Sequence, residues 1–210
     1  MTVTPRDFWD RIAPGYSQRP IADTASYARK LASTQALMRP DMQVLEFGCG
    51  TGSTALEHAP HVAHIVATDV APAMLAIGRD KAAQAGIDNI SFQEAAVEDF
   101  TAPDGSFDMV LALNLLHLLP DRAGALSKIH GLLKPGGLFI SSTVCLADRL
   151  WYLRPVIPVL QWLGKAPYVS FVSAKKVRRE VEAAGFAVQE HWSHGRANSL
   201  FMVATRVELA

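Results

Sequence analysis

The chain has 210 residues, a length that fits one domain of ordinary size with a substantial hydrophobic core. Hydrophobic residues make up 50% of it and charged residues 19%, a composition typical of folded globular proteins that excludes an intrinsically disordered chain. Twenty basic residues balance twenty acidic residues, and the formal net charge of zero argues against a nucleic-acid partner.

The beginning of the chain predicts no secretory leader, because its first ten residues mix both charges and lack an apolar run. We therefore expect a cytoplasmic protein. A first helix is predicted over residues 4–12, broken by Ala13-Pro14-Gly15, and a second over residues 24–38. Both precede the first predicted strand, so residues 1–41 are expected to form a helical flap over the site.

From residue 43 onward, apolar runs of strand length alternate with helical patterns, as in βαβ units that build a mainly parallel sheet. The predicted strands cover residues 43–47, 64–69, 90–93, 107–113, 138–143, 187–194 and 199–206. Helices are predicted from about Ser53 and over residues 72–85, 121–133 and 174–184, and a turn over residues 134–137 leads into the fifth strand. Without a repeat or linker, the sequence predicts one α/β domain over residues 1–210.

Residues 144–172 interrupt this alternation, because aromatic residues and prolines gather there. We expect an insertion after the fifth strand, facing the open carboxyl edge of the sheet. Trp151, Tyr152 and Tyr168 are predicted to form a wall of the substrate pocket, or alternatively the core beneath the insertion. The segment is too short and too charged to span a bilayer, although peripheral contact with a membrane is compatible with it.

The two cysteines, Cys49 and Cys145, lie far apart in the sequence and form no Cys-x-x-Cys pair. They predict neither a disulfide framework nor a zinc site, so we expect both to be reduced and buried, and we expect no metal.

The strongest motif is Val44-Leu45-Glu46-Phe47-Gly48-Cys49-Gly50-Thr51-Gly52, in which a buried strand turns abruptly into a glycine-rich loop. Such a loop lets a ligand lie against the backbone at the carboxyl edge of the sheet. Its spacing differs from the dinucleotide fingerprint G-x-G-x-x-G, because the third glycine arrives one residue early. The loop therefore favours close approach to a nucleoside over binding of a pyrophosphate.

Asp69 ends the second predicted strand about twenty residues after the glycines, the offset at which a carboxylate meets a ribose. Two ribose hydroxyls can donate to one carboxylate, which would also repel a 2′-phosphate. The structural alternative is that Asp69 caps the following helix.

The motifs together resemble those of the class I S-adenosylmethionine-dependent methyltransferases, over roughly residues 43–143. The motifs are Val44 to Gly52, Asp69-Val70 with Met74-Leu75, Phe107-Asp108-Met109-Val110, Asn114-Leu115-Leu116-His117 and Lys134-Pro135-Gly136-Gly137. The resemblance implies a Rossmann-like, doubly wound sheet and S-adenosylmethionine as the cofactor. The start of the chain, residues 8–16, also resembles the small-molecule members, including the quinone-biosynthesis type.

The cofactor residues implied by this resemblance are Glu46, Phe47, Gly48, Gly50, Gly52, Asp69, Val70, Met74, Ala96, Val97, Asn114, Leu115 and Tyr16. Of these, Glu46, Gly48 and Gly50 surround the methionine part, and Asp69 meets the ribose. Val70 and Met74 flank the adenine, and Asn114 with Leu115 closes the pocket beside the sulfonium. Many relatives carry an aspartate for the adenine amino group where this chain has Ala96. Either Glu98 or Asp99 replaces it, or backbone contacts suffice.

Methyl transfer from a sulfonium needs alignment and exclusion of water more than a covalent nucleophile. His117 is the candidate base for an acceptor that must lose a proton, and its alternative is a capping or packing histidine. Tyr16 and Tyr27 can close over the cofactor and the substrate, or pack the N-terminal helices on the sheet.

The sequence thus predicts a methyltransferase that acts on a small, apolar acceptor as a monomer or homodimer. Two alternatives stay open. One is a module that binds the cofactor and regulates without turnover, and the other is a nicotinamide-dependent oxidoreductase, which the glycine spacing disfavours.

Overall fold

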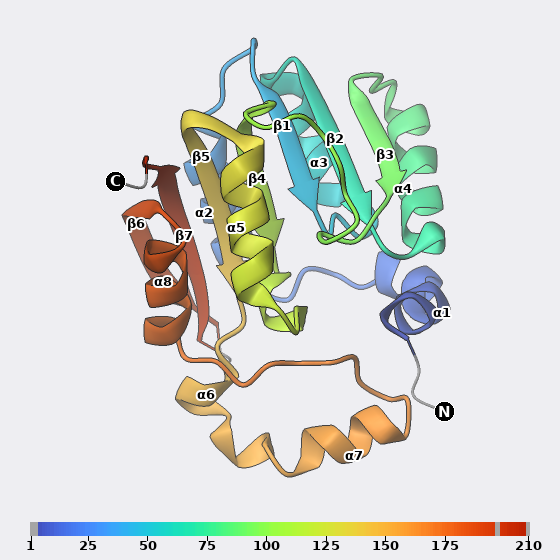
Figure 1. The fold of residues 1–210 in the computed structure, drawn as a ribbon. Helices are drawn as coiled ribbons and strands as arrows, with labels where there is room; N and C mark the ends of the chain where they lie inside the picture. Colours follow the sequence, from blue (N-terminus) through green and yellow to red (C-terminus); the bar gives the residue numbers. More distant parts are fainter. Residues whose placement is uncertain (1–3, 196–197, 209–210) are drawn as a thin grey trace.

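The computed structural model describes residues 4–195 and 198–208, and a seven-stranded sheet forms its centre (Figure 1). The strand order is β3-β2-β1-β4-β5-β7-β6, and all neighbours run parallel except β7, which is antiparallel to β5 and β6. The strands are β1 Gln43–Phe47, β2 His64–Asp69, β3 Ile90–Glu94, β4 Phe107–Leu113, β5 Leu133–Thr143, β6 Phe186–His194 and β7 Ser199–Arg206. The prediction of an α/β fold with a mainly parallel, seven-stranded sheet is confirmed.

Helices cover both faces of the sheet, with α5 and α8 in front and α2, α3 and α4 behind in Figure 1. The helices are α1 Pro5–Ser17, α2 Thr24–Gln35, α3 Ser53–His58, α4 Pro72–Ala85, α5 Arg122–Leu132, α6 Leu146–Arg149, α7 Val156–Trp162 and α8 Ala174–Ala183; short 3-10 turns are η1 Ala59–His61, η2 Leu116–Leu118 and η3 Trp151–Leu153. Each face of the sheet has its own hydrophobic core, and β4 contributes to both because strand side chains alternate between the faces. Val110 packs with Leu126 and Val177, whereas Met109 packs with Ala55 on the other face.

The carboxyl ends of β1, β2 and β4 meet at one edge of the sheet. Glu46 of β1 pairs with Ala67 of β2 on one side and with Leu111 of β4 on the other. The chain order reverses between β1 and β4, the position where open α/β sheets bind their ligands.

The break predicted at Ala13-Pro14-Gly15 is wrong, because α1 continues to Ser17 with Pro14 inside it. Proline removes one hydrogen bond of the helix, but tertiary packing holds the helix on both sides of it. Ala13 is fully buried, and the rings of Trp9 and Tyr16 meet edge-on across the proline with centroids 6.2 Å apart.

The end of α2 also differs from the prediction, because the helix stops at Gln35 before residue 38. Leu37 and Met38 donate instead to the carbonyls of Thr34 and Gln35, at 3.1 and 3.0 Å. These i to i+3 bonds tighten the last turn ahead of Pro40.

The turn predicted over residues 134–137 lies within β5 instead of before it. Leu133 already pairs with Phe107, and the register shifts before Met109 pairs with Leu138. Gly136 has a φ of 73°, so the glycine pair forms an irregularity inside the ladder that other residues would resist.

Residues 144–172, here called the strap, cross below the carboxyl edge of the sheet in Figure 1 and contain α6, η3 and α7. At the base of the strap, the Ala147 N–H donates to the Val172 carbonyl at 3.1 Å. At its far end, Arg11 of α1 donates to the carbonyl of Gly164. In the described residues no helix combines the length and apolarity needed to cross a membrane.

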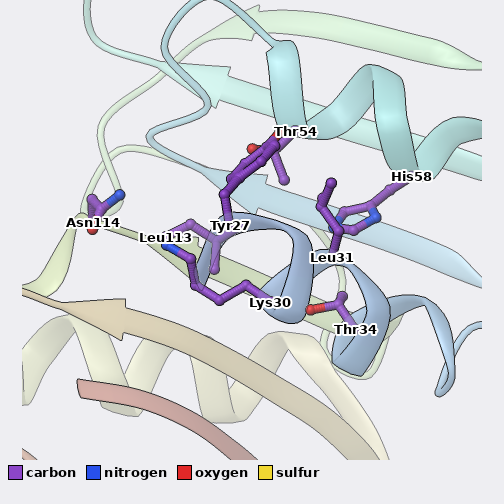
Figure 2. Close-up of a pocket in the computed structure, with 8 residues that line it drawn as sticks. All are labelled: Tyr27, Lys30, Leu31, Thr34, Thr54, His58, Leu113 and Asn114. Carbon is purple, nitrogen blue, oxygen red and sulfur yellow. The ribbon is translucent and has the colours of Figure 1, made fainter. Parts of the chain in front are cut away.

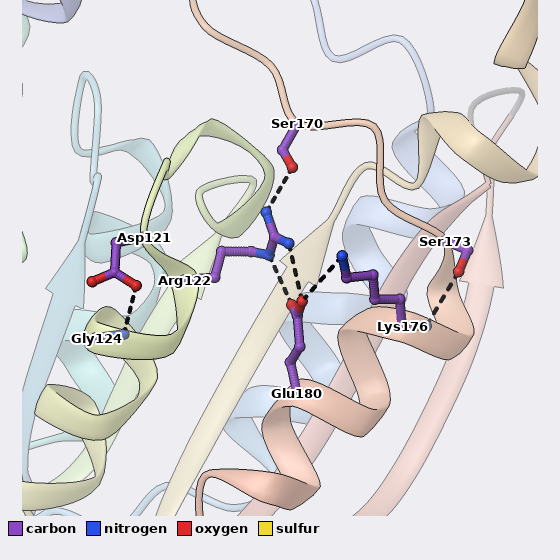
Figure 3. Close-up of polar contacts among 7 residues, drawn as sticks. All are labelled: Asp121, Arg122, Gly124, Ser170, Ser173, Lys176 and Glu180. Atoms are coloured by element: carbon purple, nitrogen blue, oxygen red, sulfur yellow. Dashed lines mark hydrogen bonds and ion pairs between the residues drawn. The ribbon is translucent and has the colours of Figure 1, made fainter.

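A charged cluster also holds the strap near its C-terminal end, at Ser170, which is here called its return (Figure 3). Arg122 at the start of α5 binds both carboxylate oxygens of Glu180, at 2.8 and 3.0 Å, and donates to the Ser170 hydroxyl at 2.6 Å. The side chain of Arg122 is 10% exposed, so this bidentate pair is shielded from water.

Candidate functional site

The glycine loop follows β1 directly and takes a backbone path that favours glycine. Gly48, Gly50 and Gly52 have φ angles of 66°, 54° and 69°. A Cβ built on Gly50 meets no atom within 4 Å, so this position opens toward the site. A Cβ on Gly52 would lie 2.8 Å from Phe92, so this glycine lets the start of α3 pack closely against the Phe92 ring.

Asp69 at the end of β2 connects the loop to α4. Its Oδ2 accepts from the Gly50 N–H at 2.8 Å, and its Oδ1 accepts from the Ala71 N–H at 3.0 Å. Burial raises the pKa of Asp69, although the backbone bonds oppose this. A carboxylate accepts about four hydrogen bonds, so Asp69 keeps capacity for ligand hydroxyls.

Glu46 is the second acid of the site, and it is 2% exposed at the end of β1. Burial, followed by the charge of Asp69, raises its pKa to about 8. Within the described part of the chain, Oε2 of Glu46 has no hydrogen-bond partner. A buried acid of this kind is ready to receive a cation, since a cation would favour its ionised form.

The end of β4 closes the site from the other side. Asn114 has a φ of 59°, and its N–H donates to the Ser142 carbonyl at 2.7 Å. A Cβ on Gly48 would lie 2.9 Å from Leu115, so the Leu115 side chain lies directly over the glycine loop. The structure thereby brings Glu46, Gly48, Asn114 and Leu115 to one edge.

Other predicted cofactor residues surround this edge to different degrees. Met74 is 1% exposed and packs with Ala13 and Ala71, so its side chain lies under α1. Val97 belongs to the hydrophobic core on the face of the sheet that α5 and α8 cover, together with partly buried Ala95. Phe47 is fully buried there, Val70 and Ala96 are half-buried, and Tyr16 is exposed at the end of α1.

Helix α1 lies against this side of the edge through polar contacts. Asp10 accepts from the Ala73 N–H at 2.8 Å, at the start of α4. Arg6 pairs with Glu94, at the end of β3, at 2.8 Å.

A small cavity of about 50 Å³ lies beside this edge, between α2, α3 and β4 (Figure 2). Its lining consists of Tyr27, Lys30, Leu31, Thr34, Thr54, His58, Leu113 and Asn114. Burial, as its main cause, raises the pKa of Tyr27. Of the lining, the sequence indicated Tyr27 and Asn114 and missed the others. For Lys30 and Thr34, the available signal was their i+3 and i+7 spacing from Tyr27 on one face of α2.

His117, the candidate base, lies in η2 just beyond the edge and is 8% exposed. Burial lowers its pKa to about 4, so the imidazole is neutral at physiological pH and a weak base. Its carbonyl accepts from the Ser170 N–H at 2.8 Å, which joins η2 to the return of the strap.

The aromatic residues of the strap are exposed to solvent. Trp151 is 70% exposed, Tyr152 56% and Tyr168 44%.

Both cysteines agree with the prediction, since Cys49 and Cys145 are free and buried. Among residues 4–195 and 198–208, no group of three or more His, Cys, Asp or Glu side chains is arranged to hold a metal ion.

Comparison with known proteins finds relatives of this chain. A family model described as a methyltransferase domain matches residues 44–137, from β1 into β5. A ubiquinone biosynthesis O-methyltransferase of Xanthomonas euvesicatoria pv. vesicatoria (strain 85-10) is 30% identical over 188 residues, which cover 87% of this chain and 77% of that protein.

A second protein of the same name, from Acinetobacter baumannii (strain ACICU), is 30% identical over 70% of this chain, and the match spans 65% of its length. Among solved structures, an S-adenosylmethionine-dependent methyltransferase from Mesorhizobium loti superposes with a TM-score of 0.72. It shares 21% sequence identity over 88% of this chain and 99% of that one, a likeness of fold.

Proposed function

We propose, since this chain belongs to the class I S-adenosylmethionine-dependent methyltransferases, that it transfers a methyl group from S-adenosylmethionine to a small acceptor molecule. One observation carries the proposal: an open glycine turn and two buried acids lie together at the same edge of the sheet. Gly50 leaves room for a ligand against the backbone, Asp69 accepts a hydrogen bond from that turn, and Oε2 of Glu46 has no hydrogen-bond partner among residues 4–195 and 198–208.

The residues at this edge fit the cofactor by their chemistry. The methionine part carries an ammonium group, which suits the buried carboxyl group of Glu46. Asp69 would accept from the ribose hydroxyls, and Gly48, Gly50 and Gly52 would allow close approach. Val70 and Met74 would flank the adenine.

At the adenine edge, we assign the backbone of Ala96 and Val97, because Glu98 and Asp99 are exposed. Asn114 and Leu115 would lie beside the sulfonium, and Tyr16 would close over it from α1.

S-adenosylmethionine supplies, when bound, a methyl group that is already activated for displacement. The chain's own residues have to orient the two reactants and exclude water. Leu115 over Gly48 is placed to do both. His117 remains a minor candidate for removing a proton, because its pKa of about 4 makes it a weak base in the free protein.

We further propose that the acceptor is apolar and reaches the edge from the strap side. Trp151, Tyr152 and Tyr168 supply an apolar surface there, and residues 149–169 contain three basic residues and no acidic one. The basic residues are Arg149, Arg154 and Lys165. Exposed aromatic rings next to cations suit peripheral contact with an anionic membrane, from which an apolar acceptor can be taken. The two relatives are named for ubiquinone biosynthesis, which supports an oxygen acceptor on such a molecule.

The experiment that tests this proposal compares ligands by calorimetry. The purified protein should bind S-adenosylhomocysteine at least tenfold more tightly than NAD, the cofactor of the alternative oxidoreductase. Equal or weaker binding of S-adenosylhomocysteine would contradict the assignment. Light scattering would show whether the working form is a monomer or a homodimer.

A second candidate is a module that binds the cofactor without turnover, and the weak basicity of His117 is the observation that favours it. Incubation with methyl-labelled S-adenosylmethionine and a lipid extract separates the two. A labelled small product supports the enzyme, whereas tight cofactor binding without any labelled product supports the module.

A further inference from the structure

The cavity between α2, α3 and the end of β4 has a chemistry of its own, and it is not explained by the residues assigned to the cofactor. We propose that it is an oxyanion subsite, which takes one carboxylate or phenolate group of a bound small molecule. Lys30 is the counter-ion of that group and His58 is its partner at the inner end. This inference rests on the proposed function, because it concerns a ligand of the same edge.

The lining combines polar groups with the side chains of Leu31 and Leu113, and it carries one formal positive charge. Tyr27, Thr34 and Thr54 contribute hydroxyl groups and Lys30 an ammonium group, while the lining contains no carboxylate. A volume of about 50 Å³ holds a group the size of a carboxylate, but not an aromatic ring. The occupant is therefore the charged or polar end of a larger molecule.

Lys30 is oriented toward the reaction edge. Figure 2 shows its side chain extending toward Leu113 and Asn114, at the carboxyl end of β4. Burial lowers the pKa of Lys30, because the ammonium is partly removed from water. An anion at the cavity would compensate for this loss of solvation.

The acids that approach Lys30 do not neutralise it at short range. Asp23 precedes α2, and its charge raises the pKa of Lys30. Its Oδ2 lies 3.8 Å from Nδ1 of His194 in β6. Glu46 and Glu57 act on Tyr27, where their charges raise its pKa. Burial raises the pKa of Glu46 to about 8 in the free protein, and a ligand ammonium paired with Glu46 would offset its charge in the complex.

His58 is the independent sign of a ligand. Its side chain is fully buried, and neither ring nitrogen has a hydrogen-bond partner among the described residues. Burial, with His61 as a smaller cause, lowers its pKa to about 4, so it is a neutral ring with one donor and one acceptor. Figure 2 places it at the opposite end of the cavity from Lys30, beside Thr34. An unpaired buried imidazole is costly, and an anionic oxygen in the cavity would accept a hydrogen bond from its ring N–H.

Two sources can supply this oxygen group at the edge. One is the carboxylate in the methionine part of the cofactor, because Thr54 lies in α3 directly after the glycine loop. The other is an ionised oxygen of the acceptor, because Asn114 borders both the cavity and the expected methyl position.

Calorimetry on Lys30→Met tests the subsite and separates the two sources. S-adenosylhomocysteine and its decarboxylated analogue are titrated into the native protein, Lys30→Met and Lys30→Arg, with the exposed Lys175→Met as the matched control. If the cofactor supplies the carboxylate, Lys30→Met loses tenfold or more in affinity for S-adenosylhomocysteine and none for the analogue. Lys30→Arg keeps the charge and should lose less.

If the acceptor supplies the oxygen, the affinity of Lys30→Met for S-adenosylhomocysteine stays within twofold of the native value. The probe is then 4-nitrophenol, whose phenolate absorbance is followed on the protein saturated with S-adenosylhomocysteine. We expect tenfold weaker phenolate binding by Lys30→Met than by the native protein.

Unchanged affinity for S-adenosylhomocysteine, together with no Lys30-dependent binding of 4-nitrophenol, would overturn the inference and leave the proposed function intact. Failure of the native protein to bind S-adenosylhomocysteine at all would instead overturn both.

Discussion

The edge formed by β1, β2 and β4 and the strap face each other across the site, yet they are built in opposite ways. Glu46 and Asp69 at the edge are buried, and backbone hydrogen bonds or glycine turns set their positions. In the strap, η3 and α7 contain no buried residue. A few contacts at its ends hold it, among them Arg122 and Arg11.

The difference separates two tasks that a methyltransferase has to combine. The cofactor is the same in every reaction, so a rigid edge serves it at no repeated cost in conformational entropy. The acceptor differs between enzymes, and a loosely packed strap can change its residues without disturbing the sheet. Substitutions in the two regions should therefore have very different effects on stability and on binding.

The largest effect is expected for Gly52→Ala in the edge. The new Cβ would lie 2.8 Å from the Phe92 ring, and the alanine backbone would have to adopt a φ of 69°. The substitution therefore combines overpacking with the strain of a left-handed backbone. We expect the free energy of unfolding to fall by about 3 kcal/mol in urea denaturation. Gly50→Ala, whose Cβ meets nothing within 4 Å, is the control and should lose about 1 kcal/mol. Equal losses would contradict the role of Gly52 in packing.

The next largest effect is expected for Asp69→Ala on cofactor binding. Loss of the carboxylate removes the proposed ribose acceptor and the bond to the Gly50 N–H. Affinity for S-adenosylhomocysteine in calorimetry should fall 10- to 100-fold, which corresponds to about 1.4–2.8 kcal/mol. Asp99→Ala, at an exposed position, should leave it unchanged. The ribose assignment does not survive an unchanged affinity in Asp69→Ala.

A smaller effect is expected for Arg122→Met, which releases the return of the strap (Figure 3). Removing this partly buried cation leaves Glu180 without its bidentate partner, so stability in urea should fall by about 1.5 kcal/mol. Limited proteolysis should then cut the strap faster. Arg178→Met removes a comparable but exposed pair with Glu182 and should cost less than about 0.5 kcal/mol. Similar losses in both variants would show that burial of the pair does not matter.

The pH dependence of cofactor binding tests the other acid of the edge. The pKa of Glu46 is about 8 in the free protein, and pairing with a ligand ammonium requires the ionised form. Binding therefore releases a proton below pH 8, and affinity should fall about fivefold, or about 1 kcal/mol, from pH 8 to pH 7. Calorimetry in two buffers of different ionisation enthalpy measures the released proton. Glu46→Gln should abolish this release, and a release that persists in this variant would assign it to another group.

The smallest effect on stability is expected in the strap itself. Trp151 and Trp162 are 70% and 77% exposed, so replacing both by Ser should change the free energy of unfolding by less than about 0.5 kcal/mol. Sedimentation with vesicles of phosphatidylcholine and phosphatidylglycerol should nevertheless show weaker binding by this double variant. Binding equal to that of the native protein would remove the strap from the proposed membrane contact.

The same comparison explains what could be predicted from the sequence. The strands of the edge follow from their apolar runs, and the turn follows from three glycines, which adopt positive φ more readily than other residues. The position of Asp69 follows from its place at the end of β2. These features depend on local rules, so the sequence predicts them well.

Features that depend on tertiary contacts were harder to predict. Pro14 indicated a break, but packing of Ala13 and the contact of Trp9 with Tyr16 keep α1 continuous. Lys30 and His58 lie on different helices and line one cavity only when α2 and α3 pack together. No local sequence pattern predicts this, since it is a property of the packed helices.

Phe92 has a consequence for how this edge can change in evolution. Its ring lies 2.8 Å from a Cβ built on Gly52 and 2.7 Å from one built on Gly78, so it fills the space that both glycines leave. A larger residue at either glycine therefore needs a smaller one at position 92. A search for second-site suppressors of Gly52→Ala should return substitutions of Phe92, and sequences that diverge here should exchange the three residues as a set.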